Sequence, residues 1–145
     1  FVAPMGEERV TQLWLKVAEN PYVDMIGHSE QREYQYDYDR VTKAFAQHNK
    51  VVEMNANSRN TRPGNEENMR QLALYCKQNG AKIAISSDAH SSFQMNNMRD
   101  VIEMLEEIDF PKERIINTSM ERLLAELALH KRPIAERIQG CFAPQ

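Results

Sequence analysis

The sequence predicts an α/β protein in which parallel strands alternate with helices. Short apolar runs of strand length end in turn residues, and the longer segments between them carry apolar residues at helical spacing. The two kinds of segment alternate along the chain with short connections, which favours right-handed crossovers between parallel strands. Four such strands cannot close a barrel, so they form either a small open sheet or part of a larger barrel.

Local signals mark the ends of most of these elements. The predicted helices cover residues 7–19, 38–48, 66–79, 94–108, 120–130 and 133–138, and the predicted strands cover residues 22–26, 51–55, 82–86 and 114–117. Pro21 ends the first helix, Asp37 is a candidate N-cap for the second, and Gly80 follows the third as a typical C-terminal glycine. Pro111 ends the fourth helix, and Ser119 caps the fifth. A polar loop over residues 56–64 follows the second strand and is long enough to bind a ligand.

The composition is that of one soluble globular domain. The chain has 145 residues with a formal net charge of −3, and we assign a single domain to residues 1–145. No cluster of lysine and arginine is evident, so we do not expect nucleic acid as a partner. No signal peptide or membrane-spanning stretch is evident either. Cys76 and Cys141 follow no metal-binding spacing and fit a reducing compartment, which predicts a cytoplasmic location.

Side chains of the kinds that bind metals lie at the ends of the predicted strands. His28 follows the first strand, Glu53 and Asn55 lie in the second, and Asp88 and His90 follow the third. Parallel strands bring their carboxyl ends to one edge of a sheet, so these side chains are expected to share a rim. Imidazole and carboxylate groups are ordinary ligands of zinc, manganese or iron. The convergence of several strand ends therefore favours a site.

Structural explanations remain open for the same residues taken singly. The run from Ser86 to Asp88 is also a good helix N-cap cluster, and on that motif alone capping and chemistry are equally plausible. Glu53 is costly to bury without a partner, so it could pair with Arg59 or Arg62 as a structural ion pair. Asn55 could simply satisfy the backbone of the loop that follows it.

Three stretches carry a resemblance to a known family. They are Asp24 to His28, Val52 to Ser58, and Ser87 to His90, and the tail stretch from Ile108 to Asn117 fits the same pattern. They resemble the C-terminal motifs of PHP-domain proteins, the polymerase and histidinol phosphatase family of metal-dependent phosphoesterases, and most closely its YcdX-type phosphatase branch. The resemblance runs along nearly the whole chain. It implies the C-terminal four βα units of a distorted barrel of seven βα units.

The resemblance implies that the full-length protein hydrolyses phosphate monoesters with the help of divalent metal ions. His28, Asp88 and His90 match metal ligands, and Asp88 and His90 are also expected to be catalytic. The family uses zinc, manganese or iron, with up to three ions in a complete domain. Arg59 and Arg62 are expected to grip the phosphate of a small phosphorylated substrate through paired N–H donors.

The chain departs from the family in what precedes the matched region. The opening His-x-His motif, further histidines and a bridging glutamate of the family have no counterpart here, and the three remaining ligands serve three different ions. We therefore expect the isolated chain to bind metal weakly and to show little or no phosphatase activity. A half-barrel exposes its edge strands, which predicts self-association or a complementing N-terminal segment. The alternative functions are a phospholigand-binding module without turnover and an accessory domain of a polymerase.

Overall fold

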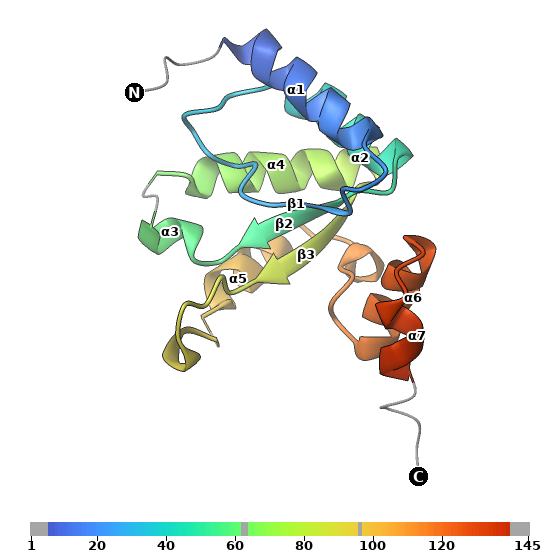
Figure 1. The fold of residues 1–145 in the computed structure, drawn as a ribbon. Coiled ribbons are helices and arrows are strands. Elements are labelled where there is room, and N and C mark those ends of the chain that lie inside the picture. The colour runs from blue at the N-terminus through green and yellow to red at the C-terminus, as the bar shows by residue number, and fades with distance from the viewer. Residues whose placement is uncertain (1–5, 62–63, 96, 140–145) are drawn as a thin grey trace.

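Three parallel strands form the sheet of this α/β protein (Figure 1). The structure is a computed structural model that describes residues 6–61, 64–95 and 97–139. Its strands are β1 (Met25–Ile26), β2 (Val51–Asn55) and β3 (Lys82–Ser86), in the order β1-β2-β3. Met25 of β1 pairs with Val51 of β2, and Asn55 of β2 pairs with Ser86 of β3. The carboxyl ends of β2 and β3 therefore lie level with each other.

Helices precede and follow each strand in the described residues. They are α1 (Glu7–Glu19), α2 (Tyr38–Gln47), α3 (Ser58–Thr61), α4 (Glu66–Asn79), α5 (Arg99–Glu107), α6 (Met120–Leu129) and α7 (Ile134–Gln139), with short 3-10 turns η1 (Ser92–Gln94) and η2 (Lys112–Arg114). The alternation of helices with parallel strands is confirmed, and four predicted elements have the observed bounds: α1, β2, α4 and β3. No helix in the described ranges is both long and apolar enough to cross a bilayer.

Capping accounts for several of these ends. Asp37 accepts a hydrogen bond from the Arg40 backbone N–H and so begins α2, as its position predicted. Ser119 does the same for α6 by accepting from the Arg122 backbone N–H. Gly80 ends α4 in the left-handed conformation, with φ of 80°, which a residue without Cβ adopts freely.

The predicted strand over residues 22–26 is wrong in its first half. Only Met25 and Ile26 pair with β2 as strand residues. The Asp24 carbonyl still accepts from the Val51 backbone N–H, but the carbonyls farther back have another partner. The Lys50 amine donates to the carbonyls of Asn20 and Val23, at 2.7 Å each. These carbonyls bend toward one ammonium group instead of lying in a ladder.

The predicted strand over residues 114–117 is reduced to a single parallel bridge between Ile83 and Ile115. The Ile116 backbone N–H donates to the carbonyl of Ile83, but the ladder stops there. At the next position the side-chain amide of Asn117 takes over, since it both donates to and accepts from the backbone of Ile85. A side chain thus occupies the edge of β3 where further strand pairing was predicted.

Two other predicted bounds need correction. The helix predicted over residues 94–108 is α5, which begins only at Arg99, because Gln94 belongs to the turn before it and accepts from the His90 backbone N–H. The loop predicted over residues 56–64 contains the single turn of helix α3. The last predicted helices are confirmed as α6 and α7 to within one residue.

The two faces of the sheet have different neighbours, as the period-2 pattern of strands requires. Val52, Met54 and Ile83 are fully buried and belong to the main core with α1, α2, α4 and α5. In Figure 1, α1, α2 and α4 lie together on one side of the sheet. The opposite face carries Val51 and Ala84, which pack with Leu123 of α6 near the amino ends of the strands.

A charged network joins α6 to the amino ends of the strands. Glu126 of α6 accepts from the Lys82 amine at 2.6 Å, and the His130 imidazole lies between the carboxylates of Glu126 and Asp24. Arg132 donates two hydrogen bonds to Asp24, the residue directly before β1. This network and Leu123 cover the amino end of that face and leave its carboxyl end to the side chains described next.

Candidate functional site

The carboxyl ends of the strands bring polar side chains together on the face that α6 covers only in part. Glu53 and Asn55 alternate with the core residues of β2, so both point to the face opposite α2 and α4. His28 follows β1 and Asp88 follows β3, on either side of Asn55. The side chains of Glu53, Asp88 and His28 are 14%, 27% and 33% exposed. We call His28, Glu53, Asn55, Asp88 and His90 the rim cluster.

Asn55 connects the two neighbouring strand ends. It is fully buried, its side-chain nitrogen lies 3.2 Å from Nδ1 of His28, and its amide also hydrogen-bonds the Asp88 carboxylate. Its side-chain oxygen accepts from the Asn57 backbone N–H at 2.9 Å. One buried amide therefore fixes His28, Asp88 and the start of the following loop relative to one another.

His28 and Asp88 both have left-handed backbone conformations, with φ of 52° and 44°. Asn49, Asp109 and Lys131 also have positive φ, but each directly follows the last turn of a helix, where this conformation is common. His28 and Asp88 follow strands instead. Non-glycine residues held in this region after strands are strained, and such strain is concentrated at functional sites.

Glu53 supports the turn that carries His28. Its Oε2 accepts from the His28 backbone N–H at 3.1 Å and lies 3.8 Å from Nδ1 of the same residue. A Cβ at Gly27 would come 3.3 Å from that oxygen, so a glycine makes room for the carboxylate. The ion pair of Glu53 with Arg59 or Arg62 remains a prediction, because the Arg59 side chain and Arg62 lie outside the described residues.

Asp88 and His90 lie side by side at the end of β3. His90 Nε2 is 3.5 Å from Oδ1 of Asp88, and the His90 side chain is 77% exposed. The hydrogen bond from Asn55 lowers the pKa of Asp88, partial burial opposes it, and nearby His28 and His90 add to the lowering. Asp88 is thus an ionised oxygen donor at neutral pH.

The donor types suit a transition metal, but the described residues alone do not complete a coordination shell. Asn55 hydrogen-bonds both the His28 imidazole and the Asp88 carboxylate, and the His90 imidazole lies beside that carboxylate. Imidazole and carboxylate groups are ordinary ligands of transition metals. In the described ranges, no three His, Cys, Asp or Glu side chains are grouped so that they could hold one ion. Further donors are therefore needed for tight binding.

Other residues near the strand ends lie outside the rim cluster. Asn57 donates weakly to the Asp88 carbonyl at 3.5 Å and so belongs to the loop around the site. Asn117 pairs with the backbone of Ile85 and is part of the edge of β3. Arg59 lies on α3 by its backbone, while its side chain, like Arg62 as a whole, falls outside the described residues, so the predicted phosphate grip stays a prediction.

Sequence reasoning missed Glu30, two residues after His28. Its side chain is fully buried and accepts a hydrogen bond from the Ser58 hydroxyl at the start of α3. The Asn68 side chain donates to its backbone carbonyl from α4. Glu30 thus ties the loop after β1 to the loop after β2, and a charged residue in a polar loop gives no sequence signal of such burial.

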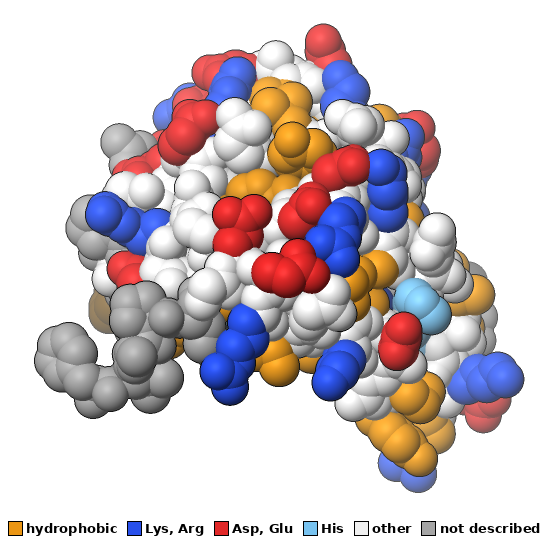
Figure 2. All heavy atoms as spheres, turned by 90° about the horizontal axis from the view of Figure 1, so that it is seen from above, with side chains coloured by type: hydrophobic (Ala, Val, Ile, Leu, Met, Phe, Trp, Pro, Cys, Tyr) orange, Lys and Arg blue, Asp and Glu red, His pale blue; other side chains and the backbone are white. Residues whose placement is uncertain are grey.

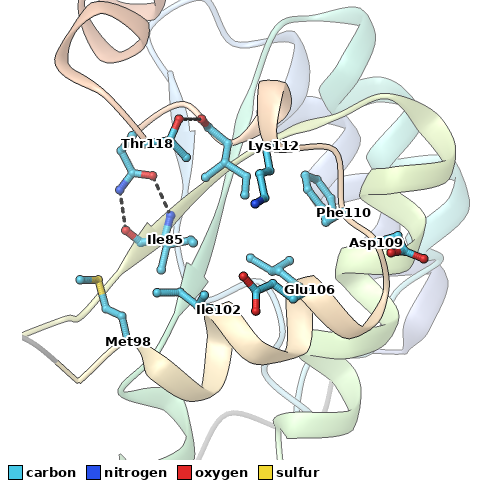
Figure 3. Close-up of a pocket in the computed structure, with 11 residues that line it drawn as sticks. Ile85, Met98, Ile102, Glu106, Asp109, Phe110, Lys112 and Thr118 are labelled. Atoms are coloured by element: carbon cyan, nitrogen blue, oxygen red, sulfur yellow. Dashed lines mark hydrogen bonds between the residues drawn. The ribbon is translucent and has the colours of Figure 1, made fainter.

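A pocket of about 740 Å³ lies apart from the rim cluster (Figure 3). Its walls are α5 and residues 109–118, with Ile85 of β3 at one side. Ile102 and Glu106 line it from α5, and Lys112 lines it from the facing turn (Figure 3). No residue of the rim cluster lines it, and the polar chemistry of the strand ends makes the rim cluster the better candidate site.

The face that carries α1 has a mixed charge pattern. Acidic and basic side chains are interspersed there around hydrophobic ones (Figure 2). Nucleic-acid binding surfaces gather lysine and arginine on one face. The mixed pattern agrees with the net charge of −3.

Comparisons with known proteins point in the same direction as the strand ends. The chain is 37% identical over 121 residues to a "Probable phosphatase" of Acetivibrio thermocellus, a match that covers 83% of this chain and 50% of the relative. A "Probable phosphatase" of Clostridium novyi is 37% identical over 127 residues, which are 87% of this chain and 52% of the relative. One of Shewanella piezotolerans is 36% identical over 126 residues, with 86% and 51% coverage. No family model matches the chain.

The chain spans about half the length of the curated relatives it matches. The similarity nevertheless covers more than four fifths of the chain itself, so it includes the strands and the rim cluster rather than one short motif. The comparisons therefore do not show the activity of a whole protein of that length.

Proposed function

We propose that this chain is part of a PHP-type metal-dependent phosphatase that hydrolyses phosphate monoesters. The observation that carries the proposal is the convergence of His28 after β1 with Asp88 and His90 after β3, with Asn55 of β2 between His28 and Asp88. The similarity to proteins named as probable phosphatases supports the reaction class. The finer assignment to the YcdX-type branch rests on the sequence motifs alone.

The residues of this chain have separate roles in the proposed reaction. Asp88, ionised at neutral pH, and the imidazole of His28 are donors for divalent zinc, manganese or iron. Bound ions of this kind supply positive charge to the phosphoryl oxygens and lower the pKa of water. His90 is accessible beside Asp88 and contacts the substrate or a further ion. Asn55 holds His28 and Asp88 in place.

The remaining donors come from outside this chain in the proposed arrangement. The rim cluster lies on a sheet face that α6 covers only toward the amino ends of the strands. We propose that a complementing segment, equivalent to the other half of the relatives' length, covers the carboxyl end and completes the barrel. Metal binding and activity of the isolated chain are then weak, and a small phosphorylated substrate enters between the two parts.

The test is a colorimetric phosphatase assay of a full-length protein that contains this segment, with and without manganese or zinc. We expect metal-dependent release of phosphate from a simple aryl phosphate. Asp88→Ala and His90→Ala are expected to lower kcat/KM by about 100-fold or more, since each removes a metal donor or a group in contact with the substrate.

Glu126→Gln is the matched control, because it replaces a carboxylate at the opposite end of the sheet. It should leave kcat/KM within a few-fold of the wild-type value once the variant is shown to be folded. Phosphate binding without turnover in the metal-loaded wild-type protein would instead support a phospholigand-binding module.

A further inference from the structure

Helix α6 buries a different side from the one that its sequence makes apolar. Apolar residues recur along it at the spacing of a single helical face: Met120, Leu123, Leu124, Leu127 and Ala128. None of these five, which all lie among the described residues, is buried. The buried residue of α6 is Glu126. A helix in a protein is stabilised mainly by burial of its apolar face, so the observed position of α6 leaves part of that stabilisation unused.

Charged groups rather than apolar contacts hold α6 on the sheet. The Lys82 amine donates to the Glu126 carboxylate at 2.6 Å, and the His130 imidazole lies 3.1 Å from the same carboxylate. Leu123 is the residue of α6 that packs with the apolar cluster of this face. The cost of removing charges from water offsets much of the attraction between them, so such pairs give little net free energy. The attachment of α6 is therefore open to competition from a better apolar surface.

The pocket beside α5 offers such a surface on the opposite side of the sheet (Figure 3). Ile102 and Leu105 line it from α5, Met98 from the residue before that helix, and Ile85 from β3. The side chain of Ile102 is 41% exposed. The pocket volume of about 740 Å³ is in the range of pockets that hold drug-sized ligands, so it has room for several leucine side chains.

The chain already connects α6 to this pocket. Thr118 lines the pocket, and α6 begins two residues later at Met120. The Arg122 guanidinium in the first turn of α6 donates to the backbone carbonyl of Lys112, which lines the pocket as well. The 10 residues of α6 extend about 15 Å, a length close to that of the 9-residue helix α5. A rotation of the backbone at Thr118 and Ser119 therefore turns α6 from the sheet to the pocket.

We propose that α6 has two positions. In the first, which the structure describes, charged groups hold it on the face of the rim cluster. In the second, its apolar face packs into the pocket beside α5, and Glu126 leaves the sheet. Helix α7 packs against α6 and moves with it. The change uncovers Val51 and Ala84 and so gives the proposed complementing segment room to cover the whole face, but the two positions do not depend on the proposed phosphatase function.

The experiment weakens the charged attachment and follows contacts between methyl groups of the 145-residue chain by NMR. Lys82→Ala leaves the buried glutamate of α6 without its lysine, which disfavours the position on the sheet. In the wild-type chain we expect nuclear Overhauser effects between Leu123 and Val51. In Lys82→Ala we expect these effects to be lost and effects between Leu124 and Ile102 to appear.

Lys43→Ala is the matched control, because it removes the lysine of another ion pair, with Asp39 on α2. It should keep the wild-type contacts of α6. The wild-type chain in molar sodium chloride gives a second measurement that needs no substitution, since the Debye length there falls to about 3 Å and the charged attachment weakens. The effects between Leu124 and Ile102 should appear in that sample too.

Two results would overturn the proposal within one chain. Effects between Leu123 and Val51 that persist both in Lys82→Ala and in molar salt would show a single position. Loss of these effects with no new contact at Ile102 would show that α6 detaches without packing again. A mixture of isotope-labelled and unlabelled chains supplies the third: contacts at Ile102 that form only between chains would assign the pocket to a second copy instead.

Discussion

At the scale of single residues, the site depends on two strained backbone positions and one buried amide. His28 and Asp88 keep positive φ two residues after the ends of β1 and β3, and Asn55 holds their side chains between them. An L-residue in the left-handed region costs free energy that glycine does not. The fold therefore stabilises a local conformation that serves the arrangement of these side chains rather than the stability of the chain.

A pair of substitutions at Asp88 isolates this backbone cost. Asp88→Gly and Asp88→Ala both remove the carboxylate, so they differ mainly in the preference of the backbone for positive φ. We expect the glycine variant to have the higher free energy of unfolding, by about 1 kcal/mol, in urea denaturation. Gln71, exposed on α4, is the control position, where alanine should be more stable than glycine by about 1 kcal/mol.

The sequence alone predicts the roles of some of these residues and not of others. His28, Asp88 and His90 could be predicted as candidates because their types and their places after apolar runs are visible in the chain. The role of Asn55 could not, because it depends on the register that sets Asn55 beside both neighbouring strand ends. The burial of Glu30 against Ser58 depends likewise on contacts between two loops.

At the scale of elements, the predicted bounds are correct where the local sequence pattern determines them. They are wrong where the side chain of another residue hydrogen-bonds the backbone in place of a strand. β2 and β3 are apolar runs bounded by polar turns, and their observed bounds match the prediction. β1 is short because the Lys50 amine takes the Val23 carbonyl, two residues before the strand, and the bridge at Ile115 stays single because Asn117 occupies the edge of β3. Such competition arises only after the chain has folded.

The packing of α2 on the sheet gives a prediction for the main core. Phe45 of α2 is fully buried and lies edge-on to the ring of Trp14, with 6.2 Å between ring centroids. Phe45→Ala is expected to lower the free energy of unfolding by about 3–5 kcal/mol, through lost burial and the cavity it leaves. Ile102→Ala on α5, where the side chain is 41% exposed, should cost much less in the same urea titration.

The network that attaches α6 gives a pH-dependent prediction. Arg132 lowers the pKa of Asp24 by hydrogen bonding, and His130 and Lys50 add to it, so the folded state favours the ionised carboxyl. A depressed folded pKa stabilises the protein above the unfolded value of about 3.9 and loses that effect as pH falls. Asp24→Asn should therefore lower the free energy of unfolding by about 1 kcal/mol at neutral pH.

The same comparison in acid supplies the control. As the pH falls below about 4, the difference in unfolding free energy between the wild-type chain and Asp24→Asn should shrink, since Asp24 becomes protonated in both states of the wild-type chain. A difference that stays constant across this range would show that the pair with Arg132 contributes nothing to the attachment of α6.

At the scale of the whole molecule, one edge of the sheet and part of one of its faces are left uncovered by the described residues. β1 is an edge strand of the described sheet, and the carboxyl end of the face with Glu53 and Asn55 is covered only in part. Edge strands and half-covered faces pair with other chains. We expect the isolated chain to self-associate or to bind a complementing segment, so its sedimentation coefficient should rise with concentration, and a monomer at all concentrations would contradict this expectation.

The central claim, that the strand ends form one metal-binding rim, is tested most directly by adding manganese(II) to the chain and recording which amide resonances broaden. We predict that broadening begins at His28, Asn55, Asp88 and His90, because a paramagnetic ion held at the rim relaxes nearby nuclei first. Broadening that begins at Asp24 and Glu126, at the opposite end of the sheet, or that affects all exposed residues alike, would contradict the claim.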